Sequence, residues 1–354
     1  MISFRLAPRV RPWRAGAVVL PLLAILVTLI LSAGVVLADG ANPLRVFVEI
    51  FIEPFRSRYS FLETLVSATP ILLTGTAVTI AFRSGYYNIG AEGQLLAGAI
   101  GAAGIGPHLG SWPAPAAVAA MTLAGLVGGM AWALVPALLR TKLNIDEVVT
   151  TLLLNPTATL LVNGLLNGPW RNPETGFNES PRIVAAAEFP EIFARSRLNF
   201  GFVVAVVVLV LAGLVMHRSV LGIKCQAVGM SRDGARFAGL PVEGLLLRAA
   251  LASGGVAGVA GACLVGGIQY RLTEGISGGL GYTGIIVSTL GGIHIVGAAC
   301  AALLLALVNV GSSSANRVFG IPAQLGDVIA GILLMTTVAL LLFRKYRVVL
   351  KRKS

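Results

Sequence analysis

Charge is the scarcest property of this sequence. Only 12% of its 354 residues are Asp, Glu, Lys or Arg, about half of the roughly 25% usual in a soluble globular protein. Hydrophobic residues make up 56%, and they recur in uninterrupted runs of span length. Such runs exclude a soluble protein, and they also exclude a β-barrel, whose strands would show short alternating segments. The composition predicts an all-α polytopic membrane protein.

Residues that bind metals are also few. The three histidines, His108, His217 and His294, fall at span ends, the first outside and the other two inside. They therefore cannot form one metal or catalytic cluster, and a membrane enzyme is disfavoured. The three cysteines are far apart and match no metal-binding spacing, so they are interpreted as packing residues: Cys225, Cys263 and Cys300. No metal or cofactor is expected.

The sequence contains no Gly-x-x-x-x-Gly-Lys-Ser/Thr phosphate-binding loop. The chain is therefore not expected to be an enzyme. If ATP hydrolysis drives it, the ATPase is another polypeptide.

Apolar runs predict about ten transmembrane segments, some of them short or broken, within residues 17–343. They cover residues 17–37, 62–82, 94–109, 114–139, 148–166, 200–216, 246–268, two segments in 282–310, and 325–343. The first run resembles a signal peptide, but it exceeds the usual h-region of about 7–15 residues, which favours an uncleaved span. Residues 282–310 hold either one long helix or two short ones broken at Gly291–His294.

Orientation decides between these alternatives. Two segments in 282–310 place the N-terminal arm (residues 1–16) and the basic tail (residues 344–354) both in the cytoplasm, as the positive-inside rule requires. This topology puts 18 of the 27 Lys and Arg residues inside and nine outside. The net charge of +12 then reflects topology, and no nucleic acid partner is needed to explain it.

The loops carry further local expectations. Residues 39–60 form a mixed-charge external loop, and residues 167–198 form a structured external loop. Asn144, followed by Asp146 and Glu147, is interpreted as the N-cap of the span at 148–166, which Pro156 should kink. Gly125, Gly128 and Gly129 offer close helix contact in the span at 114–139.

The segment Phe82–Gly98 places Arg, Asn, Glu and Gln between two long apolar runs. Lipid is an unfavourable neighbour for these groups, and non-helical backbone at membrane depth survives only inside protein or beside a wet cavity. The segment is either a broken helix beside a translocation path, which we favour, or a short cytoplasmic turn in which Glu92 caps the next helix.

A cytoplasmic loop, Gly229–Pro241, has the signals of a two-turn helix from Arg232 to Ala238. Ser231 suits its N-cap, Gly239 its C-terminal stop, and Pro241 prevents its continuation. With small residues and an apolar Phe237, such a helix is a docking element for a cytoplasmic protein, or else it is a connector lying on its own bundle.

These motifs resemble permease subunits of bacterial ABC importers, over about residues 61–343. The likeness lies in Tyr87–Gln94 (YNIGAEGQ), Asp146–Asn155 (DEVVTTLLLN) and the loop from Ala227 to Leu240. It is greatest for the nucleoside and simple-sugar branch, which is related to ribose-type and branched-chain amino acid permeases. Asn155–Pro156 departs from the pattern, in which an aromatic residue follows the Asn.

The resemblance implies that residues 17–343 are the permease domain of an importer in the bacterial cytoplasmic (inner) membrane. It implies as partners a cytoplasmic ABC ATPase, a second permease subunit (a paralogue or a copy), an external lipid-anchored binding protein and the lipid bilayer. The coupling helix to the ATPase would include Ser231, Arg232, Asp233, Ala235, Arg236, Phe237 and Gly239.

The resemblance implies that the cargo is a nucleoside or a related simple sugar. The hydroxyl and amide groups available within the spans suit such a neutral, hydroxylated solute. The candidate path residues are Asn88, Glu92, Gln94, Asn155 and Thr289. Two alternatives remain open. One is an ABC permease for ribose-type sugars or branched-chain amino acids. The other is an ion-coupled secondary transporter, which would need a buried carboxylate relay.

Overall fold

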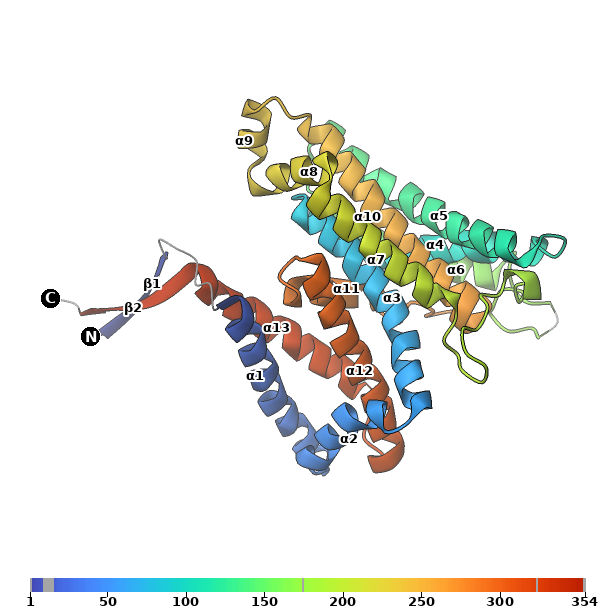
Figure 1. Ribbon diagram of the computed structural model, residues 1–354, viewed down its shortest axis with the longest axis horizontal. Coiled ribbons are helices and arrows are strands. Elements are labelled where there is room, and N and C mark those ends of the chain that lie inside the picture. The colour runs from blue at the N-terminus through green and yellow to red at the C-terminus, as the bar shows by residue number, and fades with distance from the viewer. Residues whose placement is uncertain (1, 9–15, 174, 323, 353–354) are drawn as a thin grey trace. The chain divides into compact units, whose positions relative to one another are not determined.

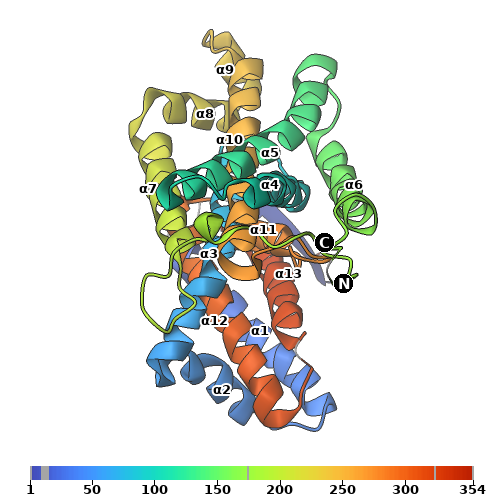
Figure 2. The same cartoon turned by 90° about the vertical axis from the view of Figure 1, so that its right-hand side faces the viewer.

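The computed structural model describes residues 2–8, 16–173, 175–322 and 324–352, and most of them are helical (Figures 1 and 2). Within these residues six helices are long and apolar enough to cross a membrane, or seven if the bent pair Leu22–Ala38 and Pro43–Arg56 is one span. Shorter apolar helices accompany them. The all-helical membrane architecture is confirmed, whereas helix length alone does not yield ten crossings.

The chain divides into two compact units. Unit 1 comprises Met1–Glu53 and Val308–Ser354, and unit 2 comprises Pro54–Leu307. The helices of unit 2 are α3 (Arg58–Arg83), α4 (Ala91–Ile105), α5 (Ala114–Leu143), α6 (Glu147–Asn167), α7 (Phe200–Arg218), α8 (Val220–Met230), α9 (Arg232–Phe237), α10 (Val242–Leu264), α11 (Leu280–Leu290) and the start of α12 (Ile295–Phe319). Three short helical turns, Gly106–His108, Ala185–Ala187 and Val265–Gln269, complete it.

Glycine contacts between α4, α5 and α10 form the centre of unit 2. A Cβ added at Gly129 would overlap the carbonyl oxygen of Gly254, and one at Gly258 would overlap that of Gly125. Gly98 of α4 meets Gly258 in the same way. Small residues let helix backbones approach this closely in a membrane. The prediction of close helix contact at Gly125, Gly128 and Gly129 is confirmed.

Two helix boundaries bear on the predictions. The run 282–310 is broken where expected, because α11 ends at Leu290 and α12 begins at Ile295. The cap expected at Asn144 is wrong. Asn144 has a left-handed backbone (φ 55°) that ends α5, and Asp146 caps α6 by accepting hydrogen bonds from the N–H groups of Val148 and Val149. An Asn side chain tolerates this conformation, which favours it at a helix C-terminus.

The connecting segments of unit 2 gather at its two ends. At one end lie the α3–α4 turn, the α5–α6 turn, α8 and α9 (Figure 1). At the other end, the loop after α6 pairs with the segment after α10 through the Glu179–Thr273 bridge and the Arg271–Glu179 ion pair. All the segments at the first end were predicted to lie inside, and both at the second were predicted to lie outside.

Unit 1 holds α1 (Gly16–Ala38), α2 (Pro43–Arg56, as far as Glu53), α12 from Val308, and α13 (Leu325–Lys345). The expected loop at 39–60 is wrong, because α2 occupies most of it and turns by 119° from α1. Val46 and Ile50 of α2 are buried in an apolar cluster with Val36 and Ile321. This burial explains why a segment with mixed charges is helical.

The ends of unit 1 form its single strand pair among the described residues. Strand β1 (Ile2–Pro8) runs antiparallel to β2 (Tyr346–Arg352), with Ile2 opposite Arg352 and Pro8 opposite Tyr346. The predicted N-terminal arm and basic tail are therefore hydrogen-bonded to each other along their described residues.

Candidate functional site

The turn between α3 and α4, residues 84–90, interrupts two apolar helices. The Ser84 hydroxyl donates to the Ile80 carbonyl at 2.8 Å as α3 ends, and Gly85 follows with φ +75°. Only glycine adopts this backbone without strain, and a Cβ there would also lie 2.9 Å from the Cα of Gly229 in the last turn of α8. The turn is thus packed inside protein. This packing agrees with both interpretations of Phe82–Gly98, the broken helix and the cytoplasmic turn.

Asn88 forms the centre of this turn and is fully buried. Its Nδ2 donates to Gln94 Oε1 at 2.8 Å and to Ser253 Oγ at 2.9 Å. Its Oδ1 accepts from the Gly90 N–H at 2.9 Å and from Gln94 Nε2 at 3.1 Å. A buried amide needs such partners to offset its lost hydration. The pair Asn88 and Gln94 therefore joins α4 and α10 across the turn.

Helix α6 contacts the same turn through two side chains. Asn155 Nδ2 donates to the Ile89 carbonyl at 2.9 Å, and its Oδ1 accepts from the Gly93 N–H at 3.0 Å. One turn earlier, Thr151 Oγ1 accepts from the Ile89 N–H at 3.2 Å. Both side chains are buried. They satisfy backbone groups that the break in the helix leaves without helical partners.

Glu92 connects the turn to a second broken helix. Its side chain is buried, and Oε2 accepts from the Gly281 N–H at 2.7 Å, in the first turn of α11. A carboxylate is favourable there because the first N–H groups of a helix lack helical partners and carry partial positive charge. Thr289 lies two turns further along α11 and is half-buried. The structure thus brings Asn88, Glu92, Gln94 and Asn155 together and leaves Thr289 outside their network.

A buried ion cluster lies at the same end of unit 2. Glu147, the first residue of α6, is 4% exposed. Its Oε2 lies 2.9 Å from Arg140 Nε of α5, and its Oε1 lies 2.8 Å from Arg232 NH2 of α9. The same Arg232 nitrogen donates to the Gly85 carbonyl at 2.6 Å. The Glu147 carboxylate therefore links the end of α5 and the start of α6 to α9. Through Arg232 it is also connected to the α3–α4 turn.

Tyr86 packs beneath this cluster and is 1% exposed. Burial and, to a smaller extent, the Glu147 carboxylate raise the pKa of Tyr86, while Arg140 opposes them. The phenol is therefore neutral at physiological pH.

Helix α9 has the predicted local structure. Ser231 Oγ accepts from the Gly234 N–H at 3.1 Å, and Gly239 ends the segment with φ +76°. Ala235 is buried against the apolar residues around it, whereas Phe237 is 97% exposed and Asp233 is nearly fully exposed. The helix therefore contacts its own bundle through Ala235 and Arg232 and presents an aromatic ring outward.

Two hollows flank α9, of about 400 Å³ and about 320 Å³. Both are lined by Arg140 and Arg232. The first also contains Tyr87 and Met230, and the second Arg236 paired with Glu243 at 2.6 Å. The hydrogen bond and charge of Glu243 raise the pKa of Arg236. The exposed surface at this end combines hollows, apolar tips and charges, as protein-binding surfaces do.

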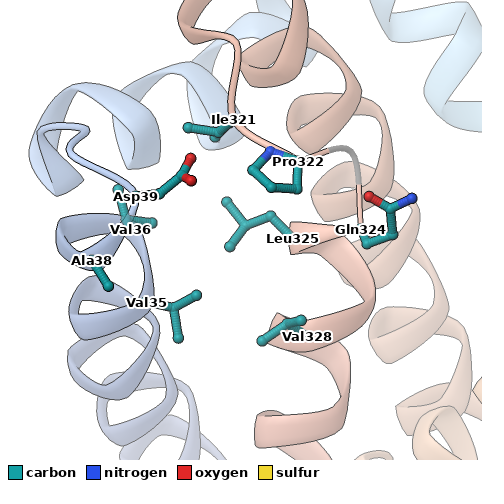
Figure 3. Close-up of a pocket in the computed structure, with 9 residues that line it drawn as sticks. All are labelled: Val35, Val36, Ala38, Asp39, Ile321, Pro322, Gln324, Leu325 and Val328. Carbon is teal, nitrogen blue, oxygen red and sulfur yellow. The ribbon is translucent and has the colours of Figure 1, made fainter.

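An apolar cavity of about 300 Å³ in unit 1 lies between the end of α1 and the start of α13 (Figure 3). Its lining has two polar side chains, Asp39 and Gln324. A sugar or nucleoside needs several convergent polar groups, so this cavity is not the candidate site.

The three histidines lie at two different ends of unit 2. His217 and His294 lie together with ring centroids 4.7 Å apart, and His217 Nε2 lies 3.4 Å from Arg83 NH1. His108 belongs to the short turn after α4, at the other end of unit 2. No group of three potential metal ligands occurs in the described part of the chain.

Sequence reasoning did not identify the ion cluster or Ser253 as part of the site. The available signal was the spacing of Glu147, Thr151 and Asn155, which places three polar residues on one face of an apolar helix. Apart from Arg140, their partners lie 60 or more residues away in the sequence, and no local pattern reveals them.

Comparison with known proteins identifies the family. The family model described as "Branched-chain amino acid transport system / permease component" matches residues 60–338. The glucose ABC transporter permease TsgB13 of Haloferax volcanii is 32% identical, covering 98% of this chain and 94% of that protein. The guanosine ABC transporter permease NupP of Bacillus subtilis is 30% identical, covering 91% of this chain and 93% of its own.

A second guanosine ABC transporter permease of B. subtilis, NupQ, is 25% identical over 68% of this chain and 77% of its own. The family match covers most of the chain, and the relatives extend it to nearly the whole length. The resemblance read from the motifs is confirmed. The chain belongs to the family of branched-chain amino acid transport system permease components, the non-catalytic, multi-pass subunits of ABC transporters in the cytoplasmic membrane.

Proposed function

We propose that this chain is the permease subunit of an importer for nucleosides or related simple sugars. One observation carries the proposal. Relatives that align over more than nine tenths of the chain are permeases for glucose and for guanosine. Both solutes are neutral and rich in hydroxyl groups, which suits spans whose polar side chains are mostly amides and hydroxyls. Family membership disfavours the alternative of an ion-coupled secondary transporter.

The partners follow from the same proposal. An ABC permease works with an ATPase, and the exposed Phe237 and the hollows beside α9 support α9 as its docking element, the coupling helix. An external lipid-anchored protein delivers the solute. A second permease subunit completes the path, and we favour a paralogue because B. subtilis has two guanosine permeases, NupP and NupQ, both similar to this chain.

We also propose ten crossings, with both termini in the cytoplasm. Helices α4, α11 and α13 then each cross, and α12 forms a separate crossing after the break at Gly291–His294. The separation of the connecting segments of unit 2 into two ends supports this topology, and so does the concentration of Lys and Arg in the N-terminal arm and the C-terminal tail.

The path residues receive a specific role in this proposal. Asn88, Gln94 and Asn155 use their amides on one another and on backbone groups, so they shape the broken helix beside the path rather than bind solute tightly. Glu92 does the same at α11, and the half-buried Thr289 remains available for contact. Weak contact suffices because the external binding protein supplies the affinity.

Uptake of radiolabelled solutes tests the proposal. Cells that lack this chain and cells that regain it are compared for guanosine, cytidine, glucose, ribose and leucine uptake. Guanosine, cytidine or glucose uptake that requires the chain supports the proposal, and these arms distinguish nucleoside from sugar. A requirement for ribose or leucine alone assigns the chain to another branch and refutes the proposed cargo.

A further inference from the structure

The contacts of α6 are divided between two very different faces. Its buried residues are Glu147, Thr151, Asn155, Ala158, Val162 and Leu166, at intervals of three or four. The opposite face exposes large apolar side chains such as Leu153 and Leu160. The first two turns of α6 are therefore held to unit 2 by a polar stripe, defined as Glu147, Thr151 and Asn155.

All three residues of this polar stripe contact the α3–α4 turn or the start of α4, either directly or through Arg232. Thr151 and Asn155 bind the backbone of Ile89 and Gly93. Glu147 reaches Gly85 indirectly, because Arg232 bonds both the Glu147 carboxylate and the Gly85 carbonyl. The polar stripe and Arg232 thus hold the turn at both ends, and a movement of α6 or of α9 displaces the same backbone.

Helix α9 has two connections to long helices, and they differ in rigidity. Toward α10, it has the Gly239–Pro241 link and the Arg236–Glu243 pair, whose side chains are both more than half exposed. Toward α6, it has the Arg232–Glu147 pair, in which the carboxylate is 6% exposed and also holds Arg140. The Glu147 carboxylate is shielded from solvent and bound by two arginines. Its pair with Arg232 therefore keeps a more fixed geometry than the exposed Arg236–Glu243 pair.

We propose that Glu147 and Arg232 are positioning residues for energy coupling. Through this pair, displacement of α9 by the ATPase moves α6 and the α3–α4 turn together. The inference rests on the proposed function, in which α9 is the coupling helix. It adds the receiving elements, α6 and the broken helix, and the two side chains that connect them to α9.

The test compares Glu147→Gln with Glu243→Gln in the assembled importer. Both residues lie at the start of a long helix and pair with an arginine of α9, at 2.8 Å and 2.6 Å. The complex of both permeases, the ATPases and the binding protein is reconstituted in vesicles. The readout is the number of solute molecules imported per ATP hydrolysed.

Glu147→Gln is expected to keep ATP hydrolysis and to lower import per ATP about tenfold, within the usual range of coupling between distant sites. Glu243→Gln is expected to leave the ratio unchanged. If Glu147→Gln leaves the ratio unchanged, or if both variants lower it equally, the proposed link is refuted.

A second variant keeps the test informative if Glu147→Gln does not assemble. Arg232→Gln leaves Glu147 paired with Arg140, so the buried carboxylate keeps one partner. It is expected to lower the ratio similarly, and adding Glu147→Gln to it should lower the ratio no further. Multiplicative losses, or an unchanged ratio in Arg232→Gln, refute the link. If the wild-type complex imports nothing, the proposed function itself is refuted.

Discussion

The side chain of Asn88 shows what a buried amide does in a membrane protein. Each of its polar atoms has two partners within 3.1 Å. The sequence indicates that such a residue among apolar runs must be surrounded by protein, and this is confirmed. It does not indicate which partners surround it, because Ser253 lies 165 residues away and is one of many small polar residues in the spans.

Removing this amide should destabilise the protein. Asn88→Ala leaves Gln94 and Ser253 with unpaired buried polar atoms, so we expect the free energy of unfolding to fall by about 2–4 kcal/mol. Denaturant titration in detergent micelles measures the change. Asn178→Ala, at an exposed loop position, is the control and should change stability by less than about 0.5 kcal/mol. Equal effects of both substitutions would contradict the network.

At the scale of elements, local signals define some helices well and others not at all. Ser231 and Gly239 define α9 within a residue, since a cap and a left-handed stop act through neighbouring backbone alone. Helix α2 was missed because Arg45, Glu49 and Glu53 suggested an aqueous loop. Its apolar residues are buried by residues 308–329, far away in the sequence.

The close contact of α4, α5 and α10 predicts opposite effects for two glycines of α10. Gly258→Ala places a methyl group against the backbone of α5, and we expect it to lower the free energy of unfolding by about 2–3 kcal/mol. Gly244→Ala meets nothing within 4 Å. It should stabilise the helix by up to about 1 kcal/mol. Thermal unfolding of the two variants in one detergent is the measurement, and a stabilised Gly258→Ala would disprove close packing.

At the scale of the whole molecule, the topology stays a prediction, drawn from the distribution of Lys and Arg along the sequence. The division into two units could not be predicted, because it depends on α1 packing against α13, a pairing between distant segments. The identity of the cargo also lies beyond the fold, since the buried amides of the α3–α4 turn bind the protein itself.

Cysteine labelling tests the orientation. Lys142→Cys and Phe177→Cys, both exposed positions at opposite ends of unit 2, are made in a variant lacking Cys225, Cys263 and Cys300. Expressed without its ATPase, the chain should react with a membrane-impermeant maleimide in intact cells at position 177 only. Position 142 should react once the cells are permeabilised. The reverse pattern would place α9 outside and remove its role as a docking element.

The pairing of α1 with α13 and of β1 with β2 also constrains the order in which the protein is made. The hydroxyl oxygens of Thr28 in α1 and Thr336 in α13 lie 3.0 Å apart and share a hydrogen bond. At about 5–20 residues per second, α1 waits for roughly 15–60 s until α13 leaves the ribosome. During that time, the face of α1 that later packs against α13 must be covered by lipid or by the insertion machinery. Unit 1 is thus the last part of the molecule to mature.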